Sequence, residues 1–311
     1  MALKIDADPG FRVDGERVPI MAMLITGASG FVGRHLVAAL LDDGHRVVGV
    51  GRRPQEQRHS HYVYIQNDLL NLDLADLQNE FGFDTIVHLA SVQPAQASLF
   101  EEFAKSNCIT TERVCQLADK VKRIIFVSSM NVYAPPTVLP VDEGAPLNQI
   151  ASDYYTQTKI LAEKIIDRNF KENHRFITLR CASIFGRGHD NGIVYSLVSD
   201  LKKNEMVELF SEGRSIRELI YVKDLVRIIQ KSMSLNQAGN YKINVGHGEK
   251  HSLREIAEFL KSTLKSSSQI VLSSKQSPRD YNFYYNVSQL KTIGGYEPQP
   301  LFSALADYAN D

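Results

Sequence analysis

The sequence predicts an α/β fold in which a doubly wound parallel sheet is covered by helices on both faces. Short apolar runs alternate with amphipathic stretches from Met21 onward, as successive βαβ units require. Each run is continuously apolar rather than alternating, which is typical of strands buried on both faces. A glycine-rich turn also separates the first apolar run from the first amphipathic stretch. Together these patterns indicate a parallel sheet with crossover helices.

The individual elements follow from local patterns along the chain. The apolar face of the first amphipathic stretch recurs with helical spacing and stops before Gly44, a residue that commonly ends helices. We expect strands at 21–25, 46–50, 85–89, 124–127 and 176–179, and helices at 32–41, 99–119 and 153–169. Beyond Ser183 the pattern loosens, although 219–222 and 241–245 again resemble strands. The later part of the chain is therefore expected to return to the sheet between less regular segments.

The length of 311 residues allows one large domain or two joined ones. We expect residues 1–20, which are charged throughout, to be a leader or a disordered extension. Residues 21–182 and 214–246 are assigned to the sheet domain. Residues 183–213 and 247–311 are assigned to a smaller, interleaved C-terminal lobe.

The composition excludes several classes of protein. With 35 Lys and Arg against 36 Asp and Glu, the chain has no net field to attract nucleic acid or an anionic membrane. No apolar run approaches the ~20 residues that span a bilayer. The three cysteines are too scattered for a disulfide framework, and the histidine pairs lack the companions of a metal site. The sequence therefore predicts a cytoplasmic protein with no metal, no nucleic acid and no membrane partner.

The glycine-rich turn, Thr26 to Gly33, carries the first chemical signal. Gly27 can take a tight turn, Gly30 allows close approach of a pyrophosphate, and Gly33 allows helix–sheet contact. The N-terminus of the following helix favours negative charge. Strand, glycine spacing and helix together predict a dinucleotide-binding site.

The end of the second strand bears on which dinucleotide binds there. Sites for NAD usually place an acid here to accept from the adenosine ribose, but this chain has Gly51 followed by Arg52 and Arg53. Two guanidinium groups suit the 2′-phosphate of NADP, although a solvated loop is the alternative interpretation. Asp68 could accept from the adenine amino group or simply cap a helix. We expect NADP, with NAD as the other option.

A second signal comes from Tyr155 and Lys159, which are four residues apart and hence on one face of the expected helix. A nearby ammonium would stabilise a phenolate and lower its pKa, so that Tyr155 could exchange a proton with a carbonyl or alcohol oxygen. Upstream, a strand end carries the hydroxyl groups of Ser128 and Ser129, which could hydrogen-bond the same oxygen.

These motifs occur in the order found in one family. Over about residues 21–300 the chain resembles an extended short-chain dehydrogenase/reductase of the NAD-dependent epimerase/dehydratase family, which acts mostly on nucleotide sugars and has a Rossmann-like fold. The resemblance implies Ser129, Tyr155 and Lys159 as catalytic residues. It implies cofactor contacts from Gly27, Ser29, Gly30, Phe31, Val32, Gly33, Arg52, Arg53, Asp68, Leu69, Leu89, Ala90, Ser91, Asn107, Tyr155 and Lys159.

The resemblance also implies a substrate site, with one departure from the family pattern. Arg217 and Arg279 match arginines that bind the substrate diphosphate, although each would otherwise be a surface ion-pair partner. Ser183 replaces an asparagine that contacts the sugar nucleotide in several members. Ser129 and Asn131 complete the expected substrate contacts.

The residues after Ser129 discriminate between reactions. Family dehydratases need an Asp-Glu pair there, and decarboxylases a glutamate, whereas this chain has Met130 and Asn131. The sequence therefore predicts a ketoreductase that reduces a nucleotide-linked 4-keto-6-deoxyhexose with NADPH. A 4-epimerase of the UDP-glucose type with bound NAD is the alternative, and a non-catalytic dinucleotide-binding regulator is the second alternative. As in many relatives, the helices at 99–119 and 153–169 are expected to form a homodimer interface.

Overall fold

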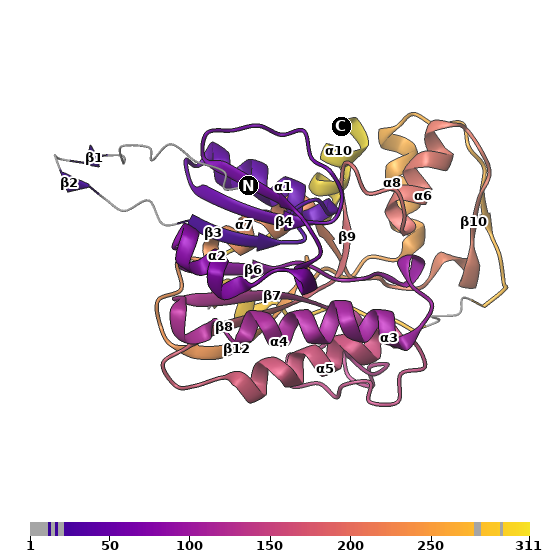
Figure 1. The fold of residues 1–311 in the computed structure, drawn as a ribbon. Coiled ribbons are helices and arrows are strands. Elements are labelled where there is room, and N and C mark those ends of the chain that lie inside the picture. Colours follow the sequence, from indigo (N-terminus) through magenta and orange to yellow (C-terminus); the bar gives the residue numbers. More distant parts are fainter. Residues whose placement is uncertain (1–11, 14–15, 18–21, 277–280, 293–294) are drawn as a thin grey trace.

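A seven-stranded parallel sheet forms the centre of the molecule (Figure 1). The structure is a computed structural model that describes residues 12–13, 16–17, 22–276, 281–292 and 295–311. The strand order is β12-β8-β7-β6-β3-β4-β5, and every neighbouring pair is parallel. The strands are β3 (Ala22–Thr26), β4 (Arg46–Gly51), β5 (Tyr62–Gln66), β6 (Thr85–His88), β7 (Arg123–Ser129), β8 (Arg175–Cys181) and β12 (Gly239–Val245). The predicted α/β fold with a doubly wound parallel sheet is confirmed.

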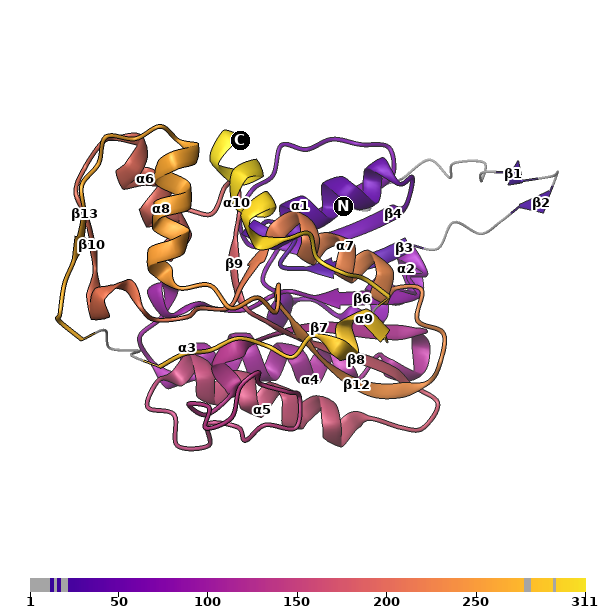
Figure 2. The ribbon, with the colours of Figure 1, turned by 180° about the vertical axis from the view of Figure 1, so that it is seen from behind.

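Helices cover both faces of the sheet. On one face lie α1 (Phe31–Asp42) and α7 (Val222–Ser232), and on the other lie α2 (Leu74–Phe81), α4 (Thr110–Cys115) and α5 (Tyr154–Asn169) (Figures 1 and 2). Side chains of successive strand residues pack into opposite cores: Leu24 packs with α2 and α4, whereas Ile25 packs with α1 and α7. This double burial is why the strand segments read as continuous apolar runs.

The segment expected to be one helix at 99–119 is interrupted. It consists of α3 (Phe100–Phe103), a π-helical segment (Ala104–Ile109) and α4. Two hydroxyl groups bond back to carbonyls four residues earlier, Thr110 Oγ1 to Ser106 O and Thr111 Oγ1 to Asn107 O, both at 2.6 Å. Such wide turns occur mostly inside α-helices and frequently at functional sites.

A third core builds the C-terminal lobe. It is formed by α6 (Ile193–Lys202), α8 (Leu253–Thr263) and α10 (Leu301–Asn310), with residues from two small parallel sheets. These sheets pair β9 (Ser183–Phe185) with β11 (Leu219–Tyr221), and β10 (Val207–Leu209) with β13 (Ile270–Leu272). The short helix α9 (Ser288–Thr292) contacts β12 instead. Val222, expected to end a strand, begins α7.

The topology fixes where a ligand can lie. From β3 the chain continues to β4 on one side, while β6 flanks β3 on the other. Ligands of open parallel sheets bind at such a switch point, beyond the carboxyl ends of the strands. The glycine-rich turn follows β3 directly, and Ser129 ends β7 at the same edge.

Candidate active site

The turn between β3 and α1 is packed too tightly for side chains. Gly27 has a φ of +70°, and a Cβ there would lie 2.8 Å from Ala90 N. At Gly33 a Cβ would lie 2.3 Å from Gly27 O. Gly30 is the N-cap of α1, and no described side chain caps this helix. The first amide groups of α1 therefore remain available to an anionic ligand.

Substituting Gly33 tests this packing. Gly33→Ala forces a methyl group against the carbonyl of Gly27, so we expect the free energy of unfolding to fall by about 1–3 kcal/mol and dinucleotide affinity to fall with it. Urea unfolding and fluorescence titration measure the two effects. Gly144→Ala is the control, because a Cβ there meets only the Asp142 side chain, at 3.3 Å. Equal behaviour of the two variants would contradict the assignment of Gly33.

At the end of β4, the place expected for an acid is already filled. A Cβ on Gly51 would lie 2.4 Å from Ser29 Oγ and 2.7 Å from the hydroxyl of Tyr64. Arg52 and Arg53 follow, and both are exposed. Their carbonyl groups accept hydrogen bonds from Gln66 Nε2 and the Tyr64 hydroxyl, respectively. The backbone of this turn is thus held by β5 while its guanidinium groups remain exposed.

Asp68 acts as a helix cap in the structure. Its Oδ1 accepts from Leu70 N at 2.9 Å at the start of a short 3-10 helix, Leu69–Asn71. Leu69 is buried, and its carbonyl accepts from Arg113 of α4 at 3.0 Å. The capping interpretation therefore describes the contacts within the chain, and contact with adenine stays a prediction.

The segment after β6 is tied to both the glycine turn and the π-helical segment. Leu89 N donates to Thr26 O and Ala90 N to Thr26 Oγ1, each at 3.2 Å. Ser91 Oγ donates to Asn107 Oδ1 at 3.0 Å. Asn107 is buried, and its Nδ2 donates to Thr158 Oγ1 of α5 at 2.9 Å. Asn107 thus holds the predicted cofactor segment from behind and joins it to α5.

The structure brings Ser129, Tyr155 and Lys159 together. The hydroxyl groups of Ser129 and Tyr155 interact, because the contact with Ser129 acts to lower the pKa of the phenol, although β7 and α5 supply them from different parts of the chain. Lys159 is 3% exposed, and its Nζ donates to Val127 O at 2.9 Å and lies 6.0 Å from the centroid of the Tyr155 ring. The trio lies at the carboxyl edge of the sheet, where Lys159 supplies a buried positive charge.

Burial sets the protonation of these groups. It lowers the pKa of Lys159 to about 8. It raises the pKa of Tyr155, although hydrogen bonds with Ser129 and Gln93 act in the opposite direction. In the protein alone, desolvation outweighs these favourable contacts. The expected lowering also depends on the positive nicotinamide of an oxidised cofactor and stays a prediction.

Comparison with known proteins identifies the family. Residues 23–246 match the NAD dependent epimerase/dehydratase family, a span that holds both the glycine turn and the trio. The chain belongs to the NAD-dependent epimerase/dehydratase family. The resemblance inferred from the motifs is thus confirmed, as is the prediction of an NAD(P)-dependent enzyme. The glycine turn fits the pyrophosphate of such a cofactor, because no described side chain caps the N-terminus of α1 that follows it.

Individual members of the epimerase/dehydratase family are similar over most of the chain. The UDP-glucose 4-epimerase of Mycolicibacterium smegmatis is 29% identical over 262 residues, covering 76% of this chain and 80% of that protein. The UDP-glucuronic acid decarboxylase 1 of Danio rerio is 29% identical over 291 residues, covering 89% and 68%. Among solved structures, MoeE5 in complex with UDP-glucuronic acid and NAD has a TM-score of 0.81 and 25% identity, covering 93% and 98%.

The residues expected to bind substrate in this family member are only partly brought together. Ser183 is exposed at the start of β9, and its Oγ lies 3.8 Å from Met130 Sδ. Asn131 follows Met130 in a 3-10 turn, Met130–Val132, and donates its N–H to Ser129 Oγ at 3.2 Å. These groups therefore lie next to Ser129.

Of the two expected diphosphate arginines, the structure describes Arg217. Arg217 is half-buried, its guanidinium donates to Tyr281 O, and its Cζ lies 5.7 Å from the centroid of that tyrosine's ring. A pocket opens next to it, lined by Ser211, Arg214, Ser215, Tyr281 and Asn282. Arg279 lies outside the described residues.

Sequence reasoning missed Gln93 and Glu163. Gln93 follows the cofactor segment and hydrogen-bonds the Tyr155 hydroxyl. Glu163 lies one helical turn after Lys159 and is 2% exposed. The spacing of Tyr155, Lys159 and Glu163 on one helical face was the available signal for Glu163, and nothing in the local sequence marks Gln93.

Proposed function

We propose that the protein is a nucleotide-sugar 4-epimerase that interconverts UDP-hexoses differing at C4. The observation that carries the proposal is the contact between the Ser129 and Tyr155 hydroxyl groups, with Lys159 buried one helical turn further along α5, in a site with no acid directly after Ser129. The similarity to UDP-glucose 4-epimerase of M. smegmatis supports the choice of substrate.

The chain's own residues supply the proton chemistry. Tyr155 takes the proton of the C4 hydroxyl group and later returns one to the 4-keto oxygen, while Ser129 hydrogen-bonds the same oxygen in both states. Lys159 provides a positive charge that favours the phenolate of Tyr155. The glycine turn would hold a nicotinamide dinucleotide, which would supply reversible hydride transfer at C4 when bound.

The acids near Ser129 are committed to other partners, which disfavours dehydration and decarboxylation. Glu163 is paired with Arg180 at 2.7 Å, and Glu143 accepts from Asn244 N at 2.9 Å. The side chain of Met130 packs on an apolar core. The similarity to a UDP-glucuronic acid decarboxylase therefore suggests the UDP-sugar class without the acid that we expect for that reaction.

The test is to incubate the purified protein with UDP-glucose or UDP-galactose, without added reductant, and to separate the products chromatographically. An epimerase approaches the same ratio of the two sugars from either side. Formation of a 4-keto-6-deoxy product instead would overturn the proposal, as would conversion of UDP-glucuronic acid into a pentose nucleotide and CO2 without interconversion of the hexoses. Any turnover would eliminate the non-catalytic regulator.

The second candidate is the NADPH-dependent reduction of a nucleotide-linked 4-keto-6-deoxyhexose. The turn of Gly51, Arg52 and Arg53 favours it, because exposed guanidinium groups suit a 2′-phosphate and a dissociable reductant suits a net two-electron step. Loss of NADPH absorbance with that substrate, together with no interconversion of UDP-hexoses, would establish the reductase instead.

Replacing both arginines tests the cofactor assignment separately from the reaction. We expect the Arg52→Ala/Arg53→Ala double variant to lose at least about tenfold in NADP affinity and to keep its NAD affinity, because only NADP carries the 2′-phosphate. Calorimetric titration measures both affinities. Arg46→Ala is the control, because Arg46 is exposed at the opposite end of β4. Unchanged NADP affinity would show that the turn is a solvated loop.

We further propose that 183–213 and 247–311 form the substrate-binding lobe and that 21–182 and 214–246 form the dinucleotide-binding domain. The separate core formed by α6, α8 and α10 supports this division. Substrate would then lie between Ser183 at the sheet edge and Arg217 beside the lobe, with Arg279 as a second predicted diphosphate ligand.

We also propose a homodimer formed through the face of α3, the π-helical segment and α5. Apolar side chains are exposed along these adjacent elements: Leu99, Phe100, Ile109, Tyr154 and Leu161. Leu161→Glu should convert the dimer into a monomer, because a charge would be buried at the interface. Light scattering after gel filtration measures the mass. Met206→Glu, on a 62% exposed residue of the other lobe, should leave the dimer intact, and a monomeric wild type would refute the interface.

A further inference from the structure

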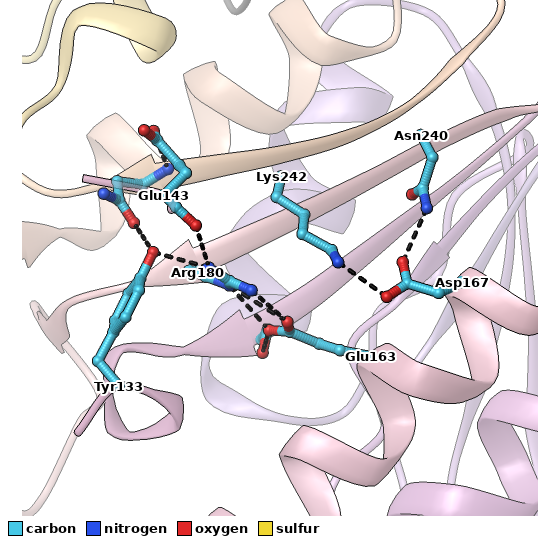
Figure 3. A network of polar contacts seen from close by, with 9 residues as sticks. Tyr133, Glu143, Glu163, Asp167, Arg180, Asn240 and Lys242 are labelled. Carbon is cyan, nitrogen blue, oxygen red and sulfur yellow. Dashed lines mark hydrogen bonds and ion pairs between the residues drawn. The ribbon is translucent and has the colours of Figure 1, made fainter. Parts of the chain in front are cut away.

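A buried ion pair between Arg180 and Glu163 joins β8 to α5 (Figure 3). Arg180 of β8 donates to Glu163 of α5 through Nη2 at 2.7 Å and through Nε at 3.2 Å. The two side chains are 3% and 2% exposed. Ser128 Oγ of β7 donates to Glu163 Oε1 at 2.6 Å. The carboxylate therefore joins α5 to two neighbouring strands of the sheet.

The ion pair adjoins the trio through the residues that neighbour it on β7 and α5. Ser128 directly precedes Ser129 and is paired in the sheet with Arg180. Glu163 lies one helical turn after Lys159, whose Nζ donates to Val127 O, the residue before Ser128. Lys159 and Glu163 thus bond to consecutive residues of β7, so α5 and the end of β7 are fixed relative to each other at two successive positions.

The other side of Arg180 extends this network across the sheet. Its Nη1 donates to the Tyr133 hydroxyl at 2.9 Å and to Glu143 O at 3.0 Å. The Tyr133 hydroxyl donates to Asn244 Oδ1 of β12 at 2.6 Å (Figure 3). Arg180 therefore also anchors the loop that follows the Met130–Val132 turn.

Stability alone gives a weak reason for such an arrangement. Removing two charges from water is costly, and buried ion pairs are often no more stabilising than apolar side chains of the same volume. A second consequence is electrostatic, since Glu163 is the nearest carboxylate along the helix to the Lys159 ammonium.

We propose that Glu163 and Arg180 are positioning residues for the reaction, an inference that rests on the proposed function. The pair holds the end of β7 against α5 so that Ser129 and Tyr155 keep their hydrogen bond, and it sets a negative charge one turn behind Lys159.

The groups around Lys159 indicate the direction of the electrostatic effect. Tyr155 and Glu163 face it from α5, His88 from β6, Cys181 and Arg180 from β8, and Cys108 from the π-helical segment. Burial raises the pKa of both thiols and lowers that of His88 to about 3, so these three groups are neutral near pH 7. Glu163 is thus the acid that opposes the burial-driven lowering of the Lys159 pKa.

The test compares Glu163→Gln with Asp167→Asn. Asp167 lies one turn further along α5 and pairs with Lys242 at 2.8 Å, but it is 40% exposed (Figure 3). We expect Glu163→Gln to lower kcat for UDP-hexose interconversion at least about tenfold, with KM changed little, and to lower the alkaline limit of the pH profile. Asp167→Asn should leave all three unchanged.

Two further measurements distinguish a positioning role from a loss of folding. The Glu163→Leu/Arg180→Met variant removes both charges, so it should fold, bind dinucleotide and still show the loss of kcat. The pKa of the Lys159 ammonium, measured without substrate by nuclear magnetic resonance with Lys159→Met as background, should fall in Glu163→Gln, because Glu163 opposes the lowering caused by burial. That shift in a protein inactive on UDP-hexoses would refute the proposed function and uphold the positioning role. Wild-type kcat and titration in the double variant would overturn the inference.

Discussion

Tyr155→Phe should reduce turnover about a thousandfold while dinucleotide affinity stays unchanged. The substitution removes only the hydroxyl that exchanges a proton with the C4 oxygen. The ring is 7% exposed and packs with Val92 and Phe103, contacts that phenylalanine retains. Initial rates and a fluorescence titration with the dinucleotide measure the two quantities.

Tyr154→Phe is the matched control for this experiment. Tyr154 is the neighbouring residue on α5 but is 42% exposed and packs edge-on against Phe100, with ring centroids 5.6 Å apart. Its substitution should leave turnover within about twofold of wild type, as for most surface changes. If Tyr155→Phe were as active as Tyr154→Phe, the proton chemistry assigned to Tyr155 would be wrong.

Lys159→Met should abolish turnover without destabilising the protein at pH 7. The substitution removes the charge that favours phenolate, so we expect a loss of at least about a hundredfold. The folded state nevertheless keeps the wild-type ammonium at a pKa of about 8 instead of 10.5, which corresponds to a burial penalty of about 3 kcal/mol at pH 7. Loss of the bond to Val127 O offsets part of the gain from removing this penalty. Enzyme assays and urea unfolding measure both effects.

The stability difference should depend on pH with a definite sign. Between pH 8 and 10.5 the unfolded wild-type chain binds more protons at Lys159 than the folded chain does, so wild-type stability rises with pH. Lys159→Met lacks this contribution, and its advantage should shrink between pH 7 and pH 10. Lys164→Met, on an exposed residue of the same helix, should show no such trend. A constant difference would mean that the pKa of Lys159 is not lowered.

Local sequence patterns were sufficient for the strands of the central sheet except β5, because strands buried on both faces must be apolar throughout. The segment 219–222, also expected to return to this sheet, instead pairs with β9. In the glycine turn, Gly30 and Gly33 both face the carbonyl of Gly27, whereas Gly27 itself packs against Ala90. The trio was likewise visible, because Tyr155 and Lys159 share a helical face and Ser129 ends a strand.

Features that depend on tertiary contacts were not visible. The interruption of the helix at 104–109 involves Asn107, whose partners lie on the segment after β6 and on α5. The raised pKa of Tyr155 depends on how completely the folded chain buries it. Helix α7 has apolar residues at Leu225, Val226 and Ile229, a spacing that could have marked it, but the strand-like run before it obscured its start.

The distribution of the third core along the chain determines the order in which the protein can assemble during synthesis. The last strand of the central sheet, β12, ends at Val245, whereas the third core requires residues from Phe185 to Ala309. The sheet can therefore form while the ribosome is still making α8 and α10. Until α10 emerges, Leu197 and Leu201 of α6 lack its apolar residues in their core. The nascent chain thus completes its sheet first and exposes the unfinished core of the lobe to chaperones until the end of translation.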